Sequence, residues 1–419
     1  MELRRVSARE CRFHPRKRFI VSKEVAADVQ IQMIRHPTAF PVRLREVIRA
    51  EAGSDPRRFY WKVYHALKNL LFWGVGKHEI KDQERWEGLD DSVDTEEEVE
   101  AAVRMFPRVM KGQFPHPSRP NGSRFYPIHA LTTSLKTVPF VPILAALGAE
   151  LGCFEPYQQG GLNVTPKIYC TKPESPIFNY RVRATTALTS LVTNQFSTSG
   201  GDHNNQDFLT RLDEVPFATL VRLSQRGFIT KEATRNTVAY SIPHATSPWM
   251  LKRIRFLLDS HPSLLSCRGR LLPLPVCYTT TFFIYTSSLS CSLNLLQTLF
   301  DLGMKYYPNE MGSFFFNESL RENDWYQQVW YHEFSTPSRK PLRFIDEVCL
   351  FFGREEVMEM INNVISKRVV RKPDAFQTSL FGAATNKDIG LDAVFLLCLQ
   401  DPYAVCSLFM NNPRNGSPE

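Results

Sequence analysis

Short amphipathic helical patterns that end at a glycine or a proline recur along this 419-residue chain. These two residues end helices because glycine readily adopts the left-handed turn that follows a helix, and proline lacks the backbone N–H that would continue it. A chain divided in this way favours short helices that pack on one another. The segments with this pattern are LVRLSQRGF, closing at Gly227, FLLDSHPSL, closing at His261-Pro262, LLQTLFDLGM, closing at Gly303, and FLLCLQDPY, closing at Asp401-Pro402.

The closing residues are spaced like the units of a helical repeat. Gly227 and His261 lie 34 residues apart, and the turn prolines Pro273 and Pro341 lie 68 residues apart, which is two such intervals. Repeats of this length are typical of solenoids, in which each helical hairpin buries its apolar face against the next one. The sequence therefore predicts an all-α fold, arranged as a solenoid of helical hairpins after a helical N-terminal region.

Two helices are expected in the N-terminal region. The first begins at Asp55-Pro56 and continues to Gly74, and the second begins with the capping box Thr95-Glu96-Glu97-Glu98 and closes at Pro107. Carboxylates are favoured in the first turn of a helix by its dipole, so Glu96, Glu97, Glu98 and Glu100 are expected on a solvated face. The expected buried residues are Tyr60, Val63, Tyr64, Leu67, Leu70 and Leu71 in the first helix and Val99, Ala102, Val103 and Phe106 in the second.

The stretch RFYPIHALTTSLKTVPFVPILAALGAELG, residues 124–152, predicts a helical hairpin. A Pro-Ile-His turn begins its first helix, Pro139 is acceptable at the start of the second, and the second is expected to end at Gly148-Ala149. This stretch resembles an ankyrin repeat, whose signature is a Thr-Pro-Leu-His turn and first helix followed by a Leu-Leu helix that closes in Gly-Ala. Tyr126 stands where that signature has its threonine.

A wider likeness extends over roughly residues 40 to 405. In order, the stretches RWEGLDDSVDTEEEVEAAVRMFPRVM, FVPILAALGAELGCFEPYQQGGL, LLDSHPSLL, LFDLGMKYYPNEMG and FLLCLQDPYAV resemble a large family of divergent ankyrin-like proteins encoded in diatom genomes. The resemblance implies a fold and no particular activity. Later units depart from the signature, since Pro275 and Arg343 stand at the histidine position and the segment from Thr279 to Ser292 is rich in Thr and Ser.

His129 is the histidine of the Pro-Ile-His turn. The ankyrin resemblance implies that its side chain hydrogen-bonds across neighbouring loops. A metal site would need a second His, a Cys or paired carboxylates at ligand spacing, and the neighbouring sequence offers none. We therefore expect His129 to have a structural role.

Nearly all of the net charge lies at the N-terminus. From Met1 through Arg58 there are fourteen Lys or Arg and seven Asp or Glu, a balance of +7 against +8 for the whole chain. Residues 1–39 are expected to be a basic, flexible arm because charged residues are dense there and apolar residues are sparse. Within this arm, Arg4, Arg5, Arg16, Lys17 and Arg18 have the spacing of a two-part nuclear import signal.

The cysteines and the apolar segments indicate a cytoplasmic or nuclear protein. The chain has nine cysteines, an odd number without a Cys-x-x-Cys pair, which favours a reducing compartment. The N-terminus lacks the apolar run of a secretory signal. Residues 271–300 contain no charge and are long enough to span a bilayer, but two prolines and many Ser and Thr make a membrane span the less favoured interpretation.

Other candidate sites are weak. FWGVGKHE lacks the third glycine of a dinucleotide loop, and the chain has neither a phosphate-binding G-x-x-x-x-G-K loop nor a G-x-S-x-G nucleophile elbow. His203 in SGGDHNNQD and His332-Glu333 lack a catalytic or metal-binding partner set. The aromatic cluster at residues 314–331 has few interleaved cations, so packing is expected in place of base stacking. We predict no catalytic residue, no cofactor and no metal.

The expected organisation is a basic arm (1–39), a helical N-terminal region (40–112), first ankyrin-like units (113–196), a polar linker loop (197–207), divergent ankyrin-like repeats (208–406) and a tail (407–419). Helical-repeat arrays present long surfaces to other proteins. The sequence therefore predicts a non-catalytic scaffold for protein–protein interaction, with protein partners and no membrane. The alternative hypothesis is a nucleic-acid-associated nuclear factor that uses the basic arm.

Overall fold

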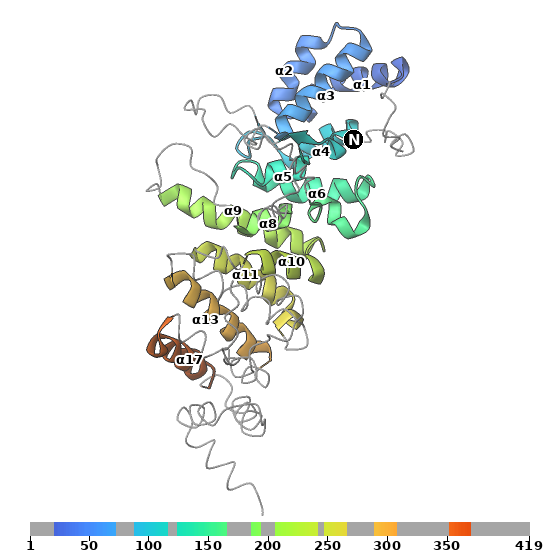
Figure 1. The fold of residues 1–419 in the computed structure, drawn as a ribbon. Coiled ribbons are helices and arrows are strands. Elements are labelled where there is room, and N and C mark those ends of the chain that lie inside the picture. The colour runs from blue at the N-terminus through green and yellow to red at the C-terminus, as the bar shows by residue number, and fades with distance from the viewer. Residues whose placement is uncertain are drawn as a thin grey trace, which may run out of the picture. The chain divides into compact units, whose positions relative to one another are not determined.

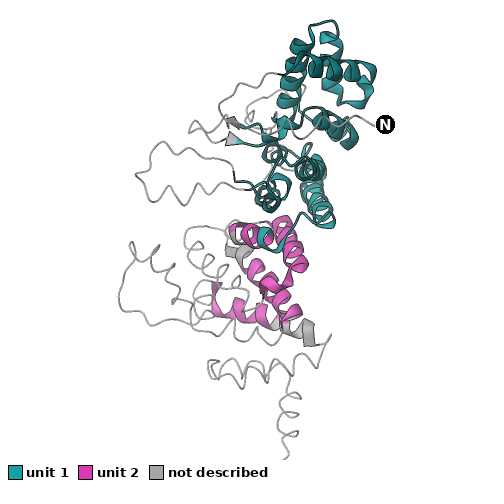
Figure 2. Cartoon of the chain, turned by 90° about the vertical axis from the view of Figure 1, so that its right-hand side faces the viewer, with its two compact units in different colours: residues 1–233 teal, residues 234–419 magenta. Residues whose placement is uncertain are grey.

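A computed structural model describes residues 21–72, 88–115, 124–165, 186–193, 206–241, 247–265, 289–307 and 352–369. Most of these residues are helical, which confirms the all-α prediction (Figure 1). The only strands among them are the two-residue segments β1 (Phe114–Pro115) and β2 (Arg124–Phe125), which pair antiparallel. The chain divides into two compact units, residues 1–233 and 234–419 (Figure 2). The polar linker expected at residues 197–207 ends before Gln206, because this residue already begins a helix.

Unit 1 begins with three helices, α1 (Lys23–Arg35), α2 (Val42–Glu51) and α3 (Pro56–Phe72), and a short 3-10 turn, η2 (Pro37–Ala39), follows α1. Helices α1 and α2 both pack against α3. The first helix expected from the sequence is therefore present, and it begins at Pro56 as expected. Its expected apolar stripe is buried except for Tyr64, which remains partly exposed.

Helix α1 corrects the prediction that residues 1–39 form a flexible arm. Ala26, Val29 and Met33 lie on one face of α1 and are buried. Ser22 caps the helix by accepting a hydrogen bond from the backbone N–H of Val25. The buried Gln30 side chain donates to two backbone carbonyl oxygens in the loop between α2 and α3. A few well-spaced apolar residues were therefore enough to anchor the second half of the basic segment.

The rest of unit 1 contains two rows of helices. Its α-helices are α4 (Glu96–Met105), α5 (Pro127–Leu131), α6 (Val141–Glu150), α8 (Ala187–Thr193) and α9 (Gln206–Gln225). Helix α5 contacts both α3 and α8, and α6 contacts both α4 and α9, while α5 also packs on α6 and α8 on α9. The 3-10 turns are η4 (Pro107–Lys111), η5 (Val138–Phe140) and η6 (Pro156–Gly161).

Helix α4 confirms the capping box and corrects the expectation for its acidic residues. The Thr95 side chain accepts from the backbone N–H of Glu98, and the Glu98 side chain accepts from that of Thr95. The expected apolar stripe, including Val99 and Phe106, is buried. However, Glu96, Glu98 and Glu100 pair with arginines and are only partly exposed, so this side of α4 is not a solvated face.

Glycines decide how α6 meets η6. The second helix of the hairpin does not end at Gly148, as expected, but continues to Glu150 and is followed by the left-handed Gly152 (φ 60°). Gly148 instead provides close packing, because a Cβ there would lie 2.5 Å from the carbonyl oxygen of Gly160. A Cβ on Gly160 would lie 1.9 Å from the carbonyl oxygen of Ala145. The two backbones therefore touch directly.

Helix α9 ends as expected at Gly227, which has a positive φ of 75°. Helix α10 (Lys231–Ser241) crosses the boundary between the units. Unit 2 then contains α11 (Pro248–Ser260), η8 (Pro262–Leu265), α13 (Leu289–Tyr306) and α17 (Arg354–Val369), and α13 packs against the other three.

The expected ends of two helices in unit 2 had different outcomes. Helix α11 stops before His261-Pro262, as predicted. Helix α13 continues through Gly303 to Tyr306, so the predicted end at Gly303 was wrong. Its last turn is held by Asp259 of α11, which accepts hydrogen bonds from Lys305 and Tyr306 at 2.7 and 2.6 Å. The expected ends at Pro273, Pro341 and Asp401-Pro402 lie outside the described residues.

No helix within the described ranges is both long enough and apolar enough to cross a membrane. Of the uncharged segment at residues 271–300, the structure describes residues 289–300, which belong to α13. The predicted apolar stripe of this segment, which includes Leu295, Leu299 and Phe300, is buried.

Candidate functional site

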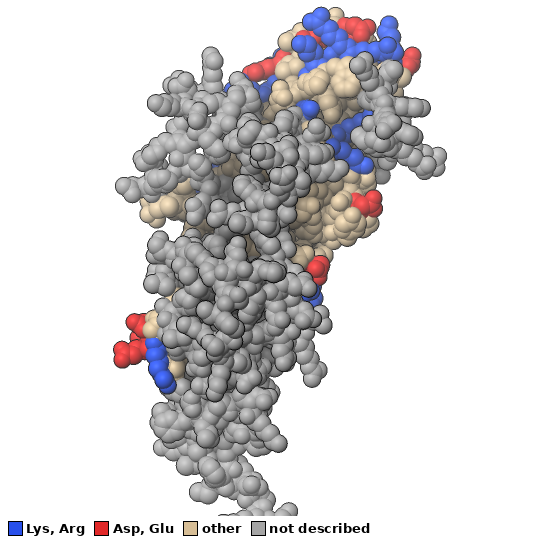
Figure 3. All heavy atoms as spheres, viewed as in Figure 1, with Lys and Arg blue, Asp and Glu red and all other residues tan. Residues whose placement is uncertain are grey.

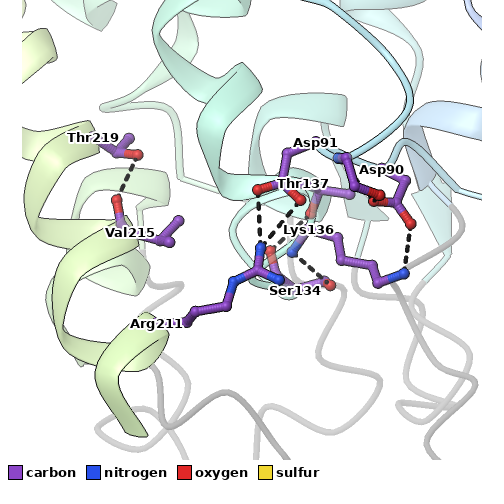
Figure 4. Close-up of polar contacts among 9 residues, drawn as sticks. Asp90, Asp91, Ser134, Lys136, Thr137, Arg211, Val215 and Thr219 are labelled. Carbon is purple, nitrogen blue, oxygen red and sulfur yellow. Dashed lines mark hydrogen bonds and ion pairs between the residues drawn. The ribbon is translucent and has the colours of Figure 1, made fainter. Parts of the chain in front are cut away.

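A polar network joins three separate parts of unit 1 (Figure 4). Arg211 of α9 donates to both carboxylate oxygens of Asp91, at 3.1 and 2.9 Å. The Lys136 ammonium group pairs with the neighbouring Asp90, and the backbone N–H of Asp91 donates to the carbonyl oxygen of Lys136 at 3.2 Å. The segment before α4, the segment before α6 and helix α9 are thus connected by charged side chains.

Two further arginines extend the polar network, Arg222 of α9 and Arg226 in the turn directly after α9. Arg222 pairs with Glu96 in the first turn of α4 and donates to the carbonyl oxygen of Pro139 at 3.3 Å. Arg226 donates to the carbonyl oxygen of Pro142 at 3.3 Å and lies 4.0 Å from Glu96. These arginines bind α9 to the beginnings of both α4 and α6.

The electrostatics of the polar network indicate a structural role. Burial alone would raise the pKa of Asp90, but hydrogen bonds from Lys136 and Ser92 hold that pKa below its usual value. A carboxylate that is paired and has a lowered pKa is a weak base, so Asp90 is not suited to accept a proton in a general-base step. The network therefore cross-links helices.

Side-chain contacts 46 residues apart recur in both units. In unit 1, Asp90 pairs with Lys136 and Arg104 pairs with Glu150, each across an interval of 46 residues. In unit 2, Arg255 pairs with Asp301 at 2.9 Å, and Asp259 with Lys305, again across 46 residues. We call this recurrence the 46-residue contact register. In unit 1 it joins α4 and the segment before it to α6 and the segment before that helix, and in unit 2 it joins α11 to α13.

His129 is buried, as a structural role requires, with 2% of its surface exposed. Its Nε2 lies 2.8 Å from the carbonyl oxygen of Val164, 35 residues along the chain. Since a carbonyl oxygen only accepts, Nε2 must carry the hydrogen and Nδ1 is left unprotonated. Nδ1 is buried and has no hydrogen-bond partner within the described ranges. Burial lowers the pKa of His129 to about 4, so the ring is neutral at neutral pH.

The outer face of α3 was missed by the sequence analysis. Arg57, Trp61, Tyr64, His65 and Lys68 recur at helical intervals and form one face, which we call the basic–aromatic face. The ring centroids of Trp61 and Tyr64 lie 5.6 Å apart, and those of Trp61 and His65 lie 5.9 Å apart. The basic and aromatic residues of this face are visible in the sequence at helical spacing, beside the apolar stripe of the same helix.

The comparisons with known proteins give no relatives. No protein-family model matches the chain, and no curated protein and no solved structure is detectably similar to it. The function must therefore be inferred from the chain itself.

Several sequence-predicted candidates lie outside the described residues. These are the import-signal residues Arg4, Arg5, Arg16, Lys17 and Arg18, together with His203, His332-Glu333 and the aromatic cluster at residues 314–331. Within the described ranges, no group of three or more His, Cys, Asp or Glu side chains could hold a metal ion.

Proposed function

We propose that this chain is a non-catalytic scaffold for protein–protein interaction, built on divergent ankyrin-like helical repeats and working in the cytoplasm or the nucleus. The observation that best supports stacked helical units is the 46-residue contact register, because ion pairs at one fixed interval are expected when similar units follow one another. This interval is longer than the 34 residues expected from the sequence. Stacked units of this kind expose long surfaces that are free to contact other proteins.

The hydrogen bond of His129 also supports the ankyrin-like interpretation. It connects the Pro-Ile-His turn to a loop 35 residues later, a distance close to one repeat of 33 or 34 residues. The signature threonine is replaced by Tyr126, whose ring packs near His129 with centroids 6.0 Å apart. The replacement is consistent with a divergent repeat.

A capture experiment with charge-swap variants tests the proposal. Tagged full-length chain is used to capture proteins from native lysate, and the captured proteins are quantified by mass spectrometry. Arg104→Glu breaks the pairs with Glu100 and Glu150, and the double variant Arg104→Glu/Glu150→Arg restores the pair between positions 104 and 150. We expect a specific set of proteins that is reduced with the single variant and recovered with the double one. If no protein is captured above a tag-only control, the scaffold proposal is wrong.

The alternative function, a nucleic-acid-associated nuclear factor, is favoured by the excess of Lys and Arg before residue 59. Its test is binding to heparin by the full-length chain and by a chain that lacks residues 1–20. The deletion stops there because α1 packs against α3, so a longer deletion would disturb the fold. If the basic arm carries this function, the deletion abolishes retention at physiological salt.

A further inference from the structure

Helix α3 has the composition of a surface that contacts an anion. Its 17 residues, PRRFYWKVYHALKNLLF, include four Lys or Arg and no Asp or Glu. Arg57, Arg58, Lys62 and His65 are exposed, while Trp61 and Lys68 are partly exposed. Lys and Arg lie over the part of unit 1 that holds α1 to α3, with several Asp and Glu among them (Figure 3). The basic–aromatic face therefore combines positive charge with accessible aromatic rings.

We propose that the basic–aromatic face of α3 binds single-stranded nucleic acid. Trp61 and His65 provide the rings on which bases stack, and Arg57 and Lys68 contact the phosphates. This inference goes beyond the scaffold function and does not depend on it. It also differs from the basic-arm hypothesis, because it assigns binding to a folded helix.

The spacing of the face suits a single strand. Trp61 lies one helical turn after Arg57 and one turn before His65, and Lys68 follows within the next turn, so cations flank the two rings. The Trp61 and His65 rings are inclined to each other by 32°, with centroids 5.9 Å apart. Proteins that bind single strands use this combination of stacking rings and backbone-tracking cations.

The electrostatic environment supports the same interpretation. Burial, followed by the charges of Lys68 and Lys62, lowers the pKa of His65, which keeps the ring neutral and available for stacking at neutral pH. Two acidic residues precede the face: Glu51 lies 3.4 Å from Arg58, and Asp55 accepts the backbone N–H of Arg57 at 3.0 Å.

A single strand fits this face better than the other polyanions. An acidic peptide or a duplex backbone would satisfy the cations, but neither would offer unpaired bases to Trp61 and His65. An anionic membrane usually binds helices that present a broad apolar face. The apolar face of α3, with Phe59, Val63 and Leu67, is buried in the core.

Fluorescence anisotropy on the full-length chain tests the proposal, with fluorescein-labelled 20-mers of deoxythymidine and of uridine. Trp61→Leu keeps an apolar side chain and removes the larger ring, and His65→Ala removes an exposed ring with little risk to folding. Because stacking stabilises binding by ~1–3 kcal/mol per base, we expect each variant to bind about 5- to 150-fold more weakly. Circular dichroism verifies that both variants are folded.

Matched controls separate the face from general charge and aromatic effects. Tyr157→Ala removes a ring that is 73% exposed elsewhere in unit 1, and Lys231→Ala removes an exposed cation on α10. Both controls should bind like the wild type. Arg57→Ala should make the negative slope of log affinity against log salt less steep by about 0.7, as expected for the loss of one phosphate contact on a single strand.

Binding to other ligands, and variants of the basic arm, show which results would contradict the proposal. Alanine at Arg4, Arg5, Arg16, Lys17 and Arg18 should leave the effect of Trp61→Leu unchanged. The proposal is wrong if the chain does not bind either 20-mer, or if Trp61→Leu and His65→Ala bind as tightly as Tyr157→Ala. Equal or tighter binding to a duplex of the same length, or to phosphatidylserine vesicles, would also contradict it.

Discussion

At the scale of single residues, the buried His129 predicts how the stability of the protein depends on pH. The folded-state pKa is about 4 and the ordinary value is 6.5, so the folded protein binds fewer protons between these values. The stability contributed by the neutral ring is therefore fully present above pH 6.5 and is lost as the pH falls towards 4. We expect His129 to account for about 3 kcal/mol of acid destabilisation, measured by urea unfolding at several pH values.

The variant His129→Gln serves as the non-titrating control. At neutral pH it should be less stable than the wild type by about 1–2 kcal/mol, because the bond to Val164 is altered. As the pH falls from 6.5 to 4, the wild type should lose this advantage and become the less stable of the two proteins, because its unfolded state gains a proton on His129 while the buried ring stays neutral. A difference that stays constant over this range would contradict the assignment.

Gly160 makes a second prediction at this scale. An alanine at this position would place its Cβ 1.9 Å from the carbonyl oxygen of Ala145 and would also adopt a positive φ. We expect Gly160→Ala to lower the free energy of unfolding by about 2–4 kcal/mol, measured by chemical denaturation.

Gly152→Ala is the matched control for Gly160→Ala. Gly152 has a similar φ of 60°, but a Cβ there would meet nothing within 4 Å. Gly152→Ala should therefore lower the free energy of unfolding by only about 1–2 kcal/mol, which is the cost of a left-handed conformation for alanine. If the two variants are equally destabilised, the backbone contact between α6 and η6 does not exist as described.

At the scale of helices, α1 predicts which part of the N-terminal segment matters for stability. Met33 is fully buried between α1 and its neighbours, so Met33→Ala should lower the free energy of unfolding by about 2–5 kcal/mol. Ile31 lies on the same helix but is 46% exposed, and Ile31→Ala should change stability by less than about 0.5 kcal/mol. Thermal unfolding of both variants measures the contrast, and equal effects would mean that α1 is not packed.

The residues before α1 predict an effect on localisation. Residues 1–20 are fused to a fluorescent reporter, and the same fusion is made with alanine at the five import-signal residues, Arg4, Arg5, Arg16, Lys17 and Arg18. We expect the first reporter to accumulate in the nucleus and the second to distribute evenly, because import receptors recognise clustered positive charge. Identical distributions would reject the import signal.

The sequence predicted helices best where local chemistry decides them. The capping box at Thr95 and the left-handed Gly227 depend on neighbouring residues only, and both are present. By contrast, α13 continues past Gly303 because Asp259, from another helix, holds its last turn. Contacts between distant segments are not visible in a local pattern, so the sequence failed there.

In the candidate site too, local features were predictable from the sequence and contacts between distant segments were not. The ankyrin resemblance implied that His129 hydrogen-bonds across neighbouring loops, whereas the carbonyl group that it contacts, that of Val164, was not identified from the sequence. The pairs of Glu96 and Glu98 with arginines far along the chain were also missed, because a helix dipole explains acidic residues in a first turn without any partner.

At the scale of the whole molecule, the division into two compact units predicts that unit 1 folds independently. Its helical rows, the polar network and the His129 bond all lie before residue 231, at which α10 begins. We therefore expect a fragment of residues 1–230 to unfold cooperatively in urea, since its own buried residues supply a core. The fragment should also show the acid destabilisation of the full-length chain and its dependence on His129. This second readout matters because helical content alone does not report tertiary packing. A fragment that is helical but unfolds gradually, without that pH dependence, would mean that unit 1 requires residues 231–419 for its packing.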